Sequence, residues 1–268
     1  MQEELSTVTA GSLVLILCLG ILLIVLPRRY AVAPILIAGC YMTLGQVLIV
    51  GGLHFYMIRI LILFGLVRLV VRKEILSVKL TVIDKLLIAW VVVHSFLYIL
   101  FDGTNVNLTE RLGYAYNALG IYFLVRALVW DLDDVVHVVK MLGIIIIPLA
   151  VLFTVEYTTG KNPFFIFGGV SEFSMIREGK LRCQGPFRHP ILAGTFGATA
   201  VPLFVGLWVY STRDRLLAAG AILAATIIVM ASSSSGPLLA YLASIVGLMC
   251  WRVKDNMIAI RWGAVVIL

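Results

Sequence analysis

Long apolar blocks, separated by short polar connections, run along almost the whole chain. Backbone groups inside a bilayer must hydrogen-bond within their own segment, and a helix needs about 20 residues to cross. Most blocks reach that length once their flanks are included, and they cover Gly11–Leu26, Ala31–Val50, Phe55–Val71, Leu86–Phe101, Leu112–Val129, Val135–Phe153, Ile191–Tyr210, Leu216–Ala231, Pro237–Trp251 and Ile258–Leu268. The pattern predicts an all-α fold, a polytopic transmembrane helical bundle of about 9–10 membrane segments.

Two of these blocks are unusual. The stretch Ala31–Gly52 contains Pro34 and several glycines, which bend or break helices, so it is either a kinked span or a re-entrant segment. If it does not cross, the first segment takes the opposite orientation. The last block carries Arg261 and is too short to cross. We therefore expect the chain to be the N-terminal part of a longer protein or a natural truncation.

One polar window, residues 154–190, interrupts the apolar pattern. It predicts one larger external loop in a single integral membrane domain covering residues 1–268. Its charged residues are more often basic than acidic, namely Lys161, Arg177, Lys180, Arg182 and Arg188 against Glu156, Glu172 and Glu178. Two interpretations stay open: a solvated loop with incidental basic residues, and an anion-binding surface in which arginine forks grip phosphate oxygens.

The distribution of lysine and arginine predicts which side of the membrane each connection faces. Cationic residues mark cytoplasmic connections, and here they follow every second block, as in Arg28-Arg29 and Arg213-Asp-Arg215. The alternate connections carry few of them. The regular alternation places the N-terminus and the 154–190 window on the outer side.

Composition excludes a soluble globular protein. Hydrophobic residues make up 62% of the chain and charged residues 13%, against about 25% charged residues in soluble domains. The net charge of +7 is explained by topology and anionic lipid at the inner face, so it does not indicate nucleic-acid binding. The four cysteines are scattered and form neither a disulfide framework nor a zinc pattern. We therefore expect no metal and no cofactor.

The segment Arg182–Pro190 concentrates candidate chemistry just before a span. Gly185-Pro186 and His189-Pro190 fix turn geometry, and a proline is well tolerated at the start of a helix. Two arginines, Arg182 and Arg188, then lie with His189 near the N-terminus of a helix, whose dipole favours anions. The alternative is a helix-entry turn with arginines that extend to the interface.

Three further features have two interpretations each. Arg111 is either a second phosphate contact or the partner of Glu110 in a surface ion pair. The run Ser232–Gly236 is favoured as a tight turn, with close approach of a lipid-linked headgroup as the alternative. His94 lies within a predicted span, and an interior histidine with satisfied hydrogen bonds is favoured over a ligand.

The chain resembles the bacterial O-antigen ligase and O-antigen polymerase family of polytopic membrane proteins. The resemblance lies in Arg182-x-x-Gly185-Pro-Phe-x-His-Pro190 leading into a span, and in Ala231-Ser-Ser-Ser-Ser-Gly236-Pro opening a later helix. The stretches Leu26-Pro-Arg-Arg-Tyr30 and Gly45-Gln46 are similar to exopolysaccharide-type members.

This resemblance implies a metal-independent membrane glycosyltransferase of the bacterial inner membrane. It would transfer a glycan from an undecaprenyl-diphosphate carrier to a lipid or sugar acceptor at the periplasmic face. The resemblance carries the diphosphate role over to Arg182. Arg188, Arg111 and Gly185 are further candidate substrate-binding residues, and His189 is a candidate for proton transfer or hydrogen bonding. The alternatives are a transporter or flippase for lipid-linked sugar, and a truncated, non-catalytic membrane protein.

Overall fold

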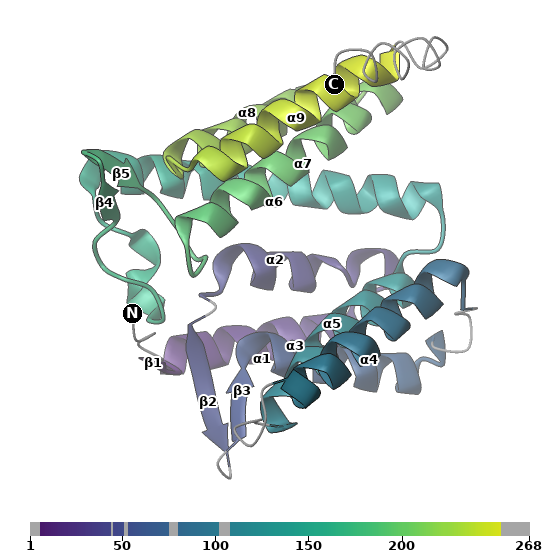
Figure 1. Cartoon of the computed structure of the whole chain (residues 1–268). Helices are drawn as coiled ribbons and strands as arrows, with labels where there is room; N and C mark the ends of the chain where they lie inside the picture. The colour runs from purple at the N-terminus through teal and green to yellow at the C-terminus, as the bar shows by residue number, and fades with distance from the viewer. Residues whose placement is uncertain (1–5, 44, 51–52, 75–79, 102–107, 253–268) are drawn as a thin grey trace. The chain divides into compact units, whose positions relative to one another are not determined.

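The computed structural model describes residues 6–43, 45–50, 53–74, 80–101 and 108–252 of the chain. It is mostly helical (Figure 1). The chain divides into two compact units, one formed by Met1–Leu142 with Phe164–Val170 and the other by Gly143–Pro163 with Ser171–Leu268.

The first unit contains a group of packed helices and a small sheet. Its core lies mainly between α1, α2, α3 and α5, where buried leucine, isoleucine and alanine side chains meet. Its sheet has the order β1-β2-β3, parallel between the first two strands and antiparallel between the last two. The elements are β1 Ser6–Thr7, α1 Ala10–Val25, the 3-10 helix η1 Arg28–Tyr30, α2 Ala33–Tyr41, β2 Gln46–Val50, β3 Leu53–Tyr56, α3 Met57–Val71, α4 Val82–Phe101, α5 Leu108–Leu128 and the first part of α6 Leu132–Thr159.

The block Ala31–Val50 is not one helix. Helix α2 ends at Tyr41, where Met42 adopts extended backbone, and the chain continues as β2. A Cβ at Gly45 would meet the backbone oxygen of Gly169, so the chain passes too close to another segment for a side chain there. The predicted interruption of this block falls after Tyr41 and not at Pro34, which lies in the first turn of α2. The interpretation of every apolar block as a helix is wrong for residues 46–50.

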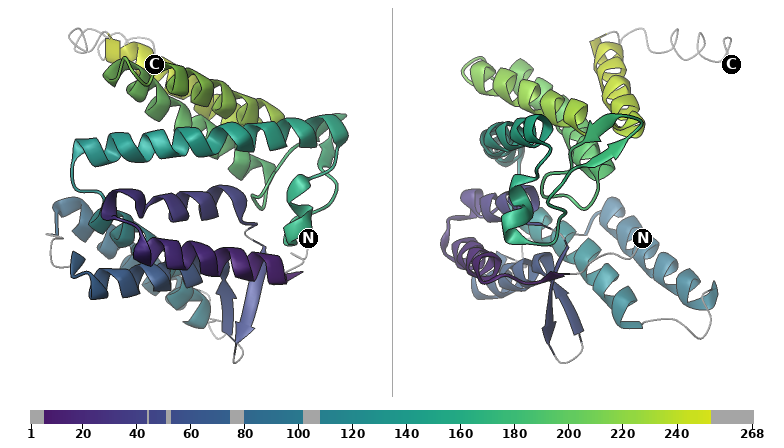
Figure 2. Two further views of the ribbon diagram at one scale, coloured as in Figure 1. Left: turned by 180° about the vertical axis from the view of Figure 1, so that it is seen from behind. Right: turned by 90° about the vertical axis from the view of Figure 1, so that its left-hand side faces the viewer.

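The second unit is organised around α7 (Pro190–Tyr210), which packs on both α8 (Arg215–Ala231) and α9 (Ser235–Arg252). Small residues allow the close packing: a Cβ at Gly197 would lie 2.7 Å from the carbonyl oxygen of Ala225. The two-stranded hairpin of β4 (Met175–Arg177) and β5 (Lys180–Arg182) also belongs to this unit, and the right-hand view of Figure 2 draws it as a pair of strands. The 3-10 helix η4 Pro163–Phe167 lies between α6 and this hairpin along the chain.

Three helices of the described residues, α4, α6 and α7, are long and apolar enough to cross a membrane. Helices α1, α8 and α9 are apolar but shorter. These helices indicate a membrane protein. The apolar block Ile258–Leu268 lies outside the described residues.

Candidate functional site

The hairpin of β4 and β5 is closed by a two-residue turn. Arg177 pairs with Lys180, and the residues between them, Glu178 and Gly179, have φ values of +54° and +71°. Positive φ at both central positions is typical of a type I′ turn, whose twist matches that of a hairpin. Glycine adopts this conformation easily, whereas glutamate does so at a cost.

Three cations share one face of this hairpin. Side chains two residues apart lie on the same face of a strand, and so do direct cross-strand partners. The register pairs Arg177 with Lys180 and Met175 with Arg182, so Arg177, Lys180 and Arg182 lie on one side. Like charges directly opposite each other destabilise a strand pair. An anion bound on this face would remove that repulsion.

The same three cations line a pocket of about 450 Å³ in the second unit. Among its described lining residues they face one carboxylate, that of Glu178, which leaves two net positive charges. The lining residues are Arg177, Glu178, Lys180, Arg182, Val229, Met230, Ser233, Ser234, Ser235 and Leu238. We call this space the cationic pocket. It is formed by the hairpin on one side and by the α8–α9 connection on the other.

Arg182 is the buried cation of the cationic pocket. Its side chain is 8% exposed, and its Nη2 donates a hydrogen bond of 2.7 Å to Ser234 Oγ. Its Nε is buried and has no hydrogen-bond partner among the described residues, and the ion pairs found among those residues do not include it. A buried charge without a counter-ion is costly. Arg182 therefore has unused capacity to bind an anion.

The serine run supplies the opposite wall of the cationic pocket. Helix α8 ends at Ala231 and α9 begins at Ser235, so the predicted break between two helices is confirmed. Ser234 Oγ donates to the carbonyl oxygen of Ser232 at 2.9 Å, and Ser233 has a φ of +44°. The first turn of a helix presents backbone N–H groups without intrahelical partners, which favours anions. The wall thus combines hydroxyl groups with a helix N-terminus.

A buried carboxylate holds the segment that follows Arg182. Glu156, near the end of α6, is fully buried. Its Oε1 accepts hydrogen bonds from Ser174 Oγ (2.8 Å) and Gln184 N (3.0 Å), and its Oε2 accepts one from Gly185 N (2.9 Å). The sequence pattern places this residue among the charges of an external loop. The structure shows that it is an internal hydrogen-bond acceptor instead.

Cys183 lies beside this carboxylate and is also buried. Its backbone N–H donates to the carbonyl oxygen of Ala231 at 2.9 Å. Burial, followed by the negative charge of Glu156, raises the pKa of the Cys183 thiol to about 12. A thiol in this position stays protonated at neutral pH and reacts slowly.

The other predicted residues of this segment have the following positions. Gly185 has a φ of +56°, and a Cβ there would lie 2.5 Å from the Phe153 ring, so its role is to shape the segment. His189 precedes α7, and its Nδ1 accepts a hydrogen bond of 3.2 Å from Ile191 N as a helix cap. Arg188 is half-buried. The described lining of the cationic pocket includes neither Arg188 nor His189.

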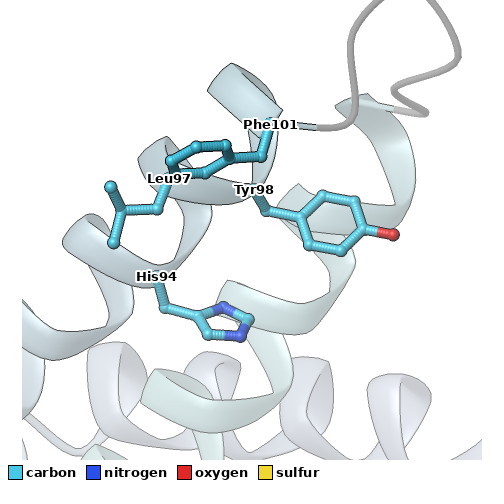
Figure 3. Close-up of a pocket in the computed structure, with 4 residues that line it drawn as sticks. All are labelled: His94, Leu97, Tyr98 and Phe101. Atoms are coloured by element: carbon cyan, nitrogen blue, oxygen red, sulfur yellow. The ribbon is translucent and has the colours of Figure 1, made fainter.

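Arg111 belongs to the first unit. Its guanidinium carbon lies 3.2 Å from the centroid of the Tyr98 ring, and its Nη2 lies 3.8 Å from Glu110 Oε1. Tyr98 also lines a pocket of about 330 Å³ together with His94, Leu97 and Phe101 (Figure 3). The Nδ1 of His94 is buried without a hydrogen-bond partner among the described residues, which differs from the satisfied interior histidine that we expected.

Two parts of the site are not apparent from the spacing of charges alone. The hairpin has a weak sequence signal, since Glu178-Gly179 lies between two short segments, of which Lys-Leu-Arg alternates polar and apolar residues, as paired strands around a tight turn do. The contact between Arg182 and Ser234 has none, because these residues are 52 positions apart.

Candidate metal ligands are sparse in the part of the chain that the structure describes: it contains no group of three or more histidine, cysteine, aspartate or glutamate side chains placed to hold an ion. Comparison with known proteins adds no relative, because no family model, no curated protein and no solved structure matches this chain.

Proposed function

We propose that this chain is a multi-pass protein of the bacterial inner membrane that binds the diphosphate of an undecaprenyl-linked glycan. In this proposal it takes part in transferring that glycan to a lipid or sugar acceptor at the periplasmic face. The observation that carries the proposal is Arg182, a buried guanidinium in the cationic pocket with an unpaired Nε and no carboxylate partner among the described ion pairs.

The membrane part of the proposal rests on the two helices that precede and follow the β4–β5 hairpin in the sequence. Helices α6 and α7 are both candidate spans, and the cationic pocket draws its hairpin from the connection between them. A connection between two consecutive spans lies at one membrane surface. The alternation of lysine and arginine along the sequence assigns that surface to the outside.

The chemistry of the pocket suits a diphosphate leaving group. Transfer of the glycan leaves negative charge on the diphosphate, and preorganised cations and N–H groups stabilise such charge most effectively away from water. An arginine fork matches the geometry of phosphate oxygens. Arg182 and the start of α9 provide these groups, while Lys180 and Arg177 add positive charge at the more exposed side.

Activation of the acceptor hydroxyl requires a base. His189 remains the candidate base from the family resemblance. Its Nδ1 accepts the Ile191 N–H, so the neutral ring carries its proton on Nε2, and His189 would have to release this cap to take the acceptor proton at Nδ1. A base must come within hydrogen-bond reach of the hydroxyl that it activates, and His189 is not part of the described pocket lining. The proposal therefore rests on binding of the glycan donor, the undecaprenyl-diphosphate-linked glycan.

The test is complementation of a deletion strain. Loss of the gene should cause the carrier-linked glycan to accumulate in the outer leaflet, and the wild-type chain should clear it. An Arg182→Met variant should fail to clear it although it inserts normally. The matched control is Arg213→Met, which removes an exposed arginine from the α7–α8 connection.

Three results would contradict the proposal. Full clearance by Arg182→Met would show that the buried cation is not required. Equal failure of both variants would point to a general loss of charge or insertion. Accumulation of carrier in the inner leaflet would indicate a lipid-linked sugar flippase instead of a transferase.

A further inference from the structure

Glu156 is a carboxylate buried where an apolar residue would be expected. It lies in the last part of α6, is 0% exposed, and the ion pairs found among the described residues do not include it. Its two oxygens instead accept three hydrogen bonds, two of them from the backbone of Gln184 and Gly185. Burying a carboxylate is costly unless its hydrogen bonds are made. The three donors around position 156 therefore require a side chain with two acceptor oxygens.

These hydrogen bonds fix the backbone immediately after Arg182. On one side, Glu156 holds Gln184 and Gly185, and Asn162 Nδ2 donates to the Gly185 oxygen at 2.8 Å. On the other side, the Cys183 N–H donates to Ala231 at the end of α8. Residues 183–185 are thus attached to α6 and α8 at once. Arg182 directly precedes this segment, so its position depends on both attachments.

We infer that Glu156 is a positioning residue: by holding residues 184 and 185, it places the Arg182 guanidinium against Ser234 in the cationic pocket. This inference rests on the proposed function for the identity of the ligand. It adds a residue that does not touch the ligand and that acts through the backbone. The chemical class of ligand is the diphosphate of a lipid carrier.

A glutamine cannot replace this carboxylate fully. Three donors converge on its two oxygens, and the amide of glutamine has only one acceptor oxygen. Its NH₂ group would face either the N–H of Gly185 or the donors at the other oxygen. At least one buried backbone N–H would then lose its partner. The segment should shift to recover a hydrogen bond, and Arg182 should shift with it.

The experiment measures ligand affinity and the exposure of Cys183 in the same purified protein. The ligand is undecaprenyl pyrophosphate in detergent, with undecaprenol and inorganic pyrophosphate as separate arms that distinguish binding of the lipid from binding of the free anion. Exposure is the rate of iodoacetamide alkylation of Cys183, read from its peptide by mass spectrometry. The variants are Glu156→Gln and the matched control Glu172→Gln, whose carboxylate is 43% exposed and pairs with Lys161 at 3.6 Å.

We expect Glu156→Gln to weaken undecaprenyl pyrophosphate binding by about tenfold or more, as the loss of one buried hydrogen bond implies. Alkylation of Cys183 should accelerate by a similar factor, because the covering segment has moved and the neighbouring charge is gone. Glu172→Gln should change both values by less than about twofold, as is typical of exposed ion pairs. Glu156→Asp keeps the charge on a side chain that is one methylene shorter. Its affinity and its Cys183 alkylation rate should lie between those of the wild type and Glu156→Gln.

Unchanged affinity in folded Glu156→Gln would overturn the inference, even if its thermal midpoint falls, because a purely structural role predicts that combination. If that variant does not fold, wild-type affinity in Glu156→Asp would overturn it equally. If the wild type binds none of the probes, the proposed function fails. Faster Cys183 alkylation in Glu156→Asp, which keeps the charge beside the thiol, would then still support positioning of the segment, and an unchanged rate would reject it.

Discussion

Replacing Arg182 by methionine should separate ligand binding from stability. Methionine keeps much of the volume and apolar contact of the arginine stem but removes its charge and donors. The Arg182 side chain makes one hydrogen bond among the described residues, to Ser234, and its Nε is buried without a partner there. Its side chain is 8% exposed. The residue therefore has a desolvation cost that its protein contacts offset only in part.

The stability change can be estimated from these contacts. Losing one charge-assisted hydrogen bond costs about 1.5–3 kcal/mol. In the other direction, methionine removes the desolvation penalty of a buried charge without a counter-ion, which is several kcal/mol for a fully buried ion. Ser234 keeps its hydrogen bond to the Ser232 carbonyl, so it is not left unpaired. The two effects nearly cancel, and the free energy of unfolding should change by less than about 2 kcal/mol.

The binding change should be much larger. A diphosphate held by Arg182 loses at least one charged hydrogen bond in the variant, and two such bonds, at about 1.5–3 kcal/mol each, correspond to a loss of affinity of about 100-fold or more. The assay is binding of undecaprenyl pyrophosphate to purified protein in detergent, with the thermal midpoint recorded in parallel. Arg177→Met is the control on the same hairpin face, because Arg177 is 69% exposed and lies near Glu178. It should lose less than about tenfold.

Two outcomes would refute this reasoning. A variant that unfolds much more easily but binds normally when folded would make Arg182 a structural residue. Equal losses of affinity in Arg177→Met and Arg182→Met would mean that the ligand senses only the general positive charge of the hairpin.

Three other predictions concern packing and the buried thiol. Gly185→Ala should lower the thermal midpoint more than Gly179→Ala, because both positions have positive φ but only the first faces an aromatic ring at 2.5 Å; equal losses would mean that backbone strain alone decides. Gly197→Ala should destabilise the packing of α7 on α8 by about 1–3 kcal/mol, whereas Gly206→Ala, with open space around it, should be neutral or stabilising. The measurement is thermal unfolding in detergent, and a lower thermal midpoint for Gly206→Ala than for Gly197→Ala would contradict the packing. Alkylation of Cys183 should stay slow up to about pH 11, because its pKa of about 12 keeps the folded thiol protonated. The free energy of unfolding should fall as the pH rises from 9.0, the ordinary pKa of a cysteine thiol, towards about 12, because in this range the unfolded chain loses the proton that the folded chain keeps. Rapid alkylation of the folded protein near pH 9, followed by mass spectrometry, would contradict that shift.

The helices were predictable where apolar residues continue without interruption. Helices α7, α8 and α9 begin and end within two residues of the apolar blocks, because proline, charge and the serine run mark their limits. The block Ala31–Val50 was not predictable in detail. Its helix ends at Tyr41, and Gly45 then passes close to Gly169, a contact between distant segments that hydrophobicity does not reveal.

The candidate site was predictable in part. The basic residues of the 154–190 window indicate an anion site, but their pattern does not separate Arg182 from Arg188. The structure does, because only Arg182 is among the described lining residues of the cationic pocket. Glu156 reads as one more loop charge in the sequence, yet it is fully buried. Its importance depends on backbone donors whose positions are set only when the chain folds.

The most direct test of the account is an experimental structure of the protein with undecaprenyl pyrophosphate bound. The account predicts diphosphate density in the cationic pocket, within hydrogen-bond distance of the Arg182 guanidinium and beside the first turn of α9. Well-ordered density for the diphosphate elsewhere on the protein, with Arg182 bonded only to Ser234, would contradict it.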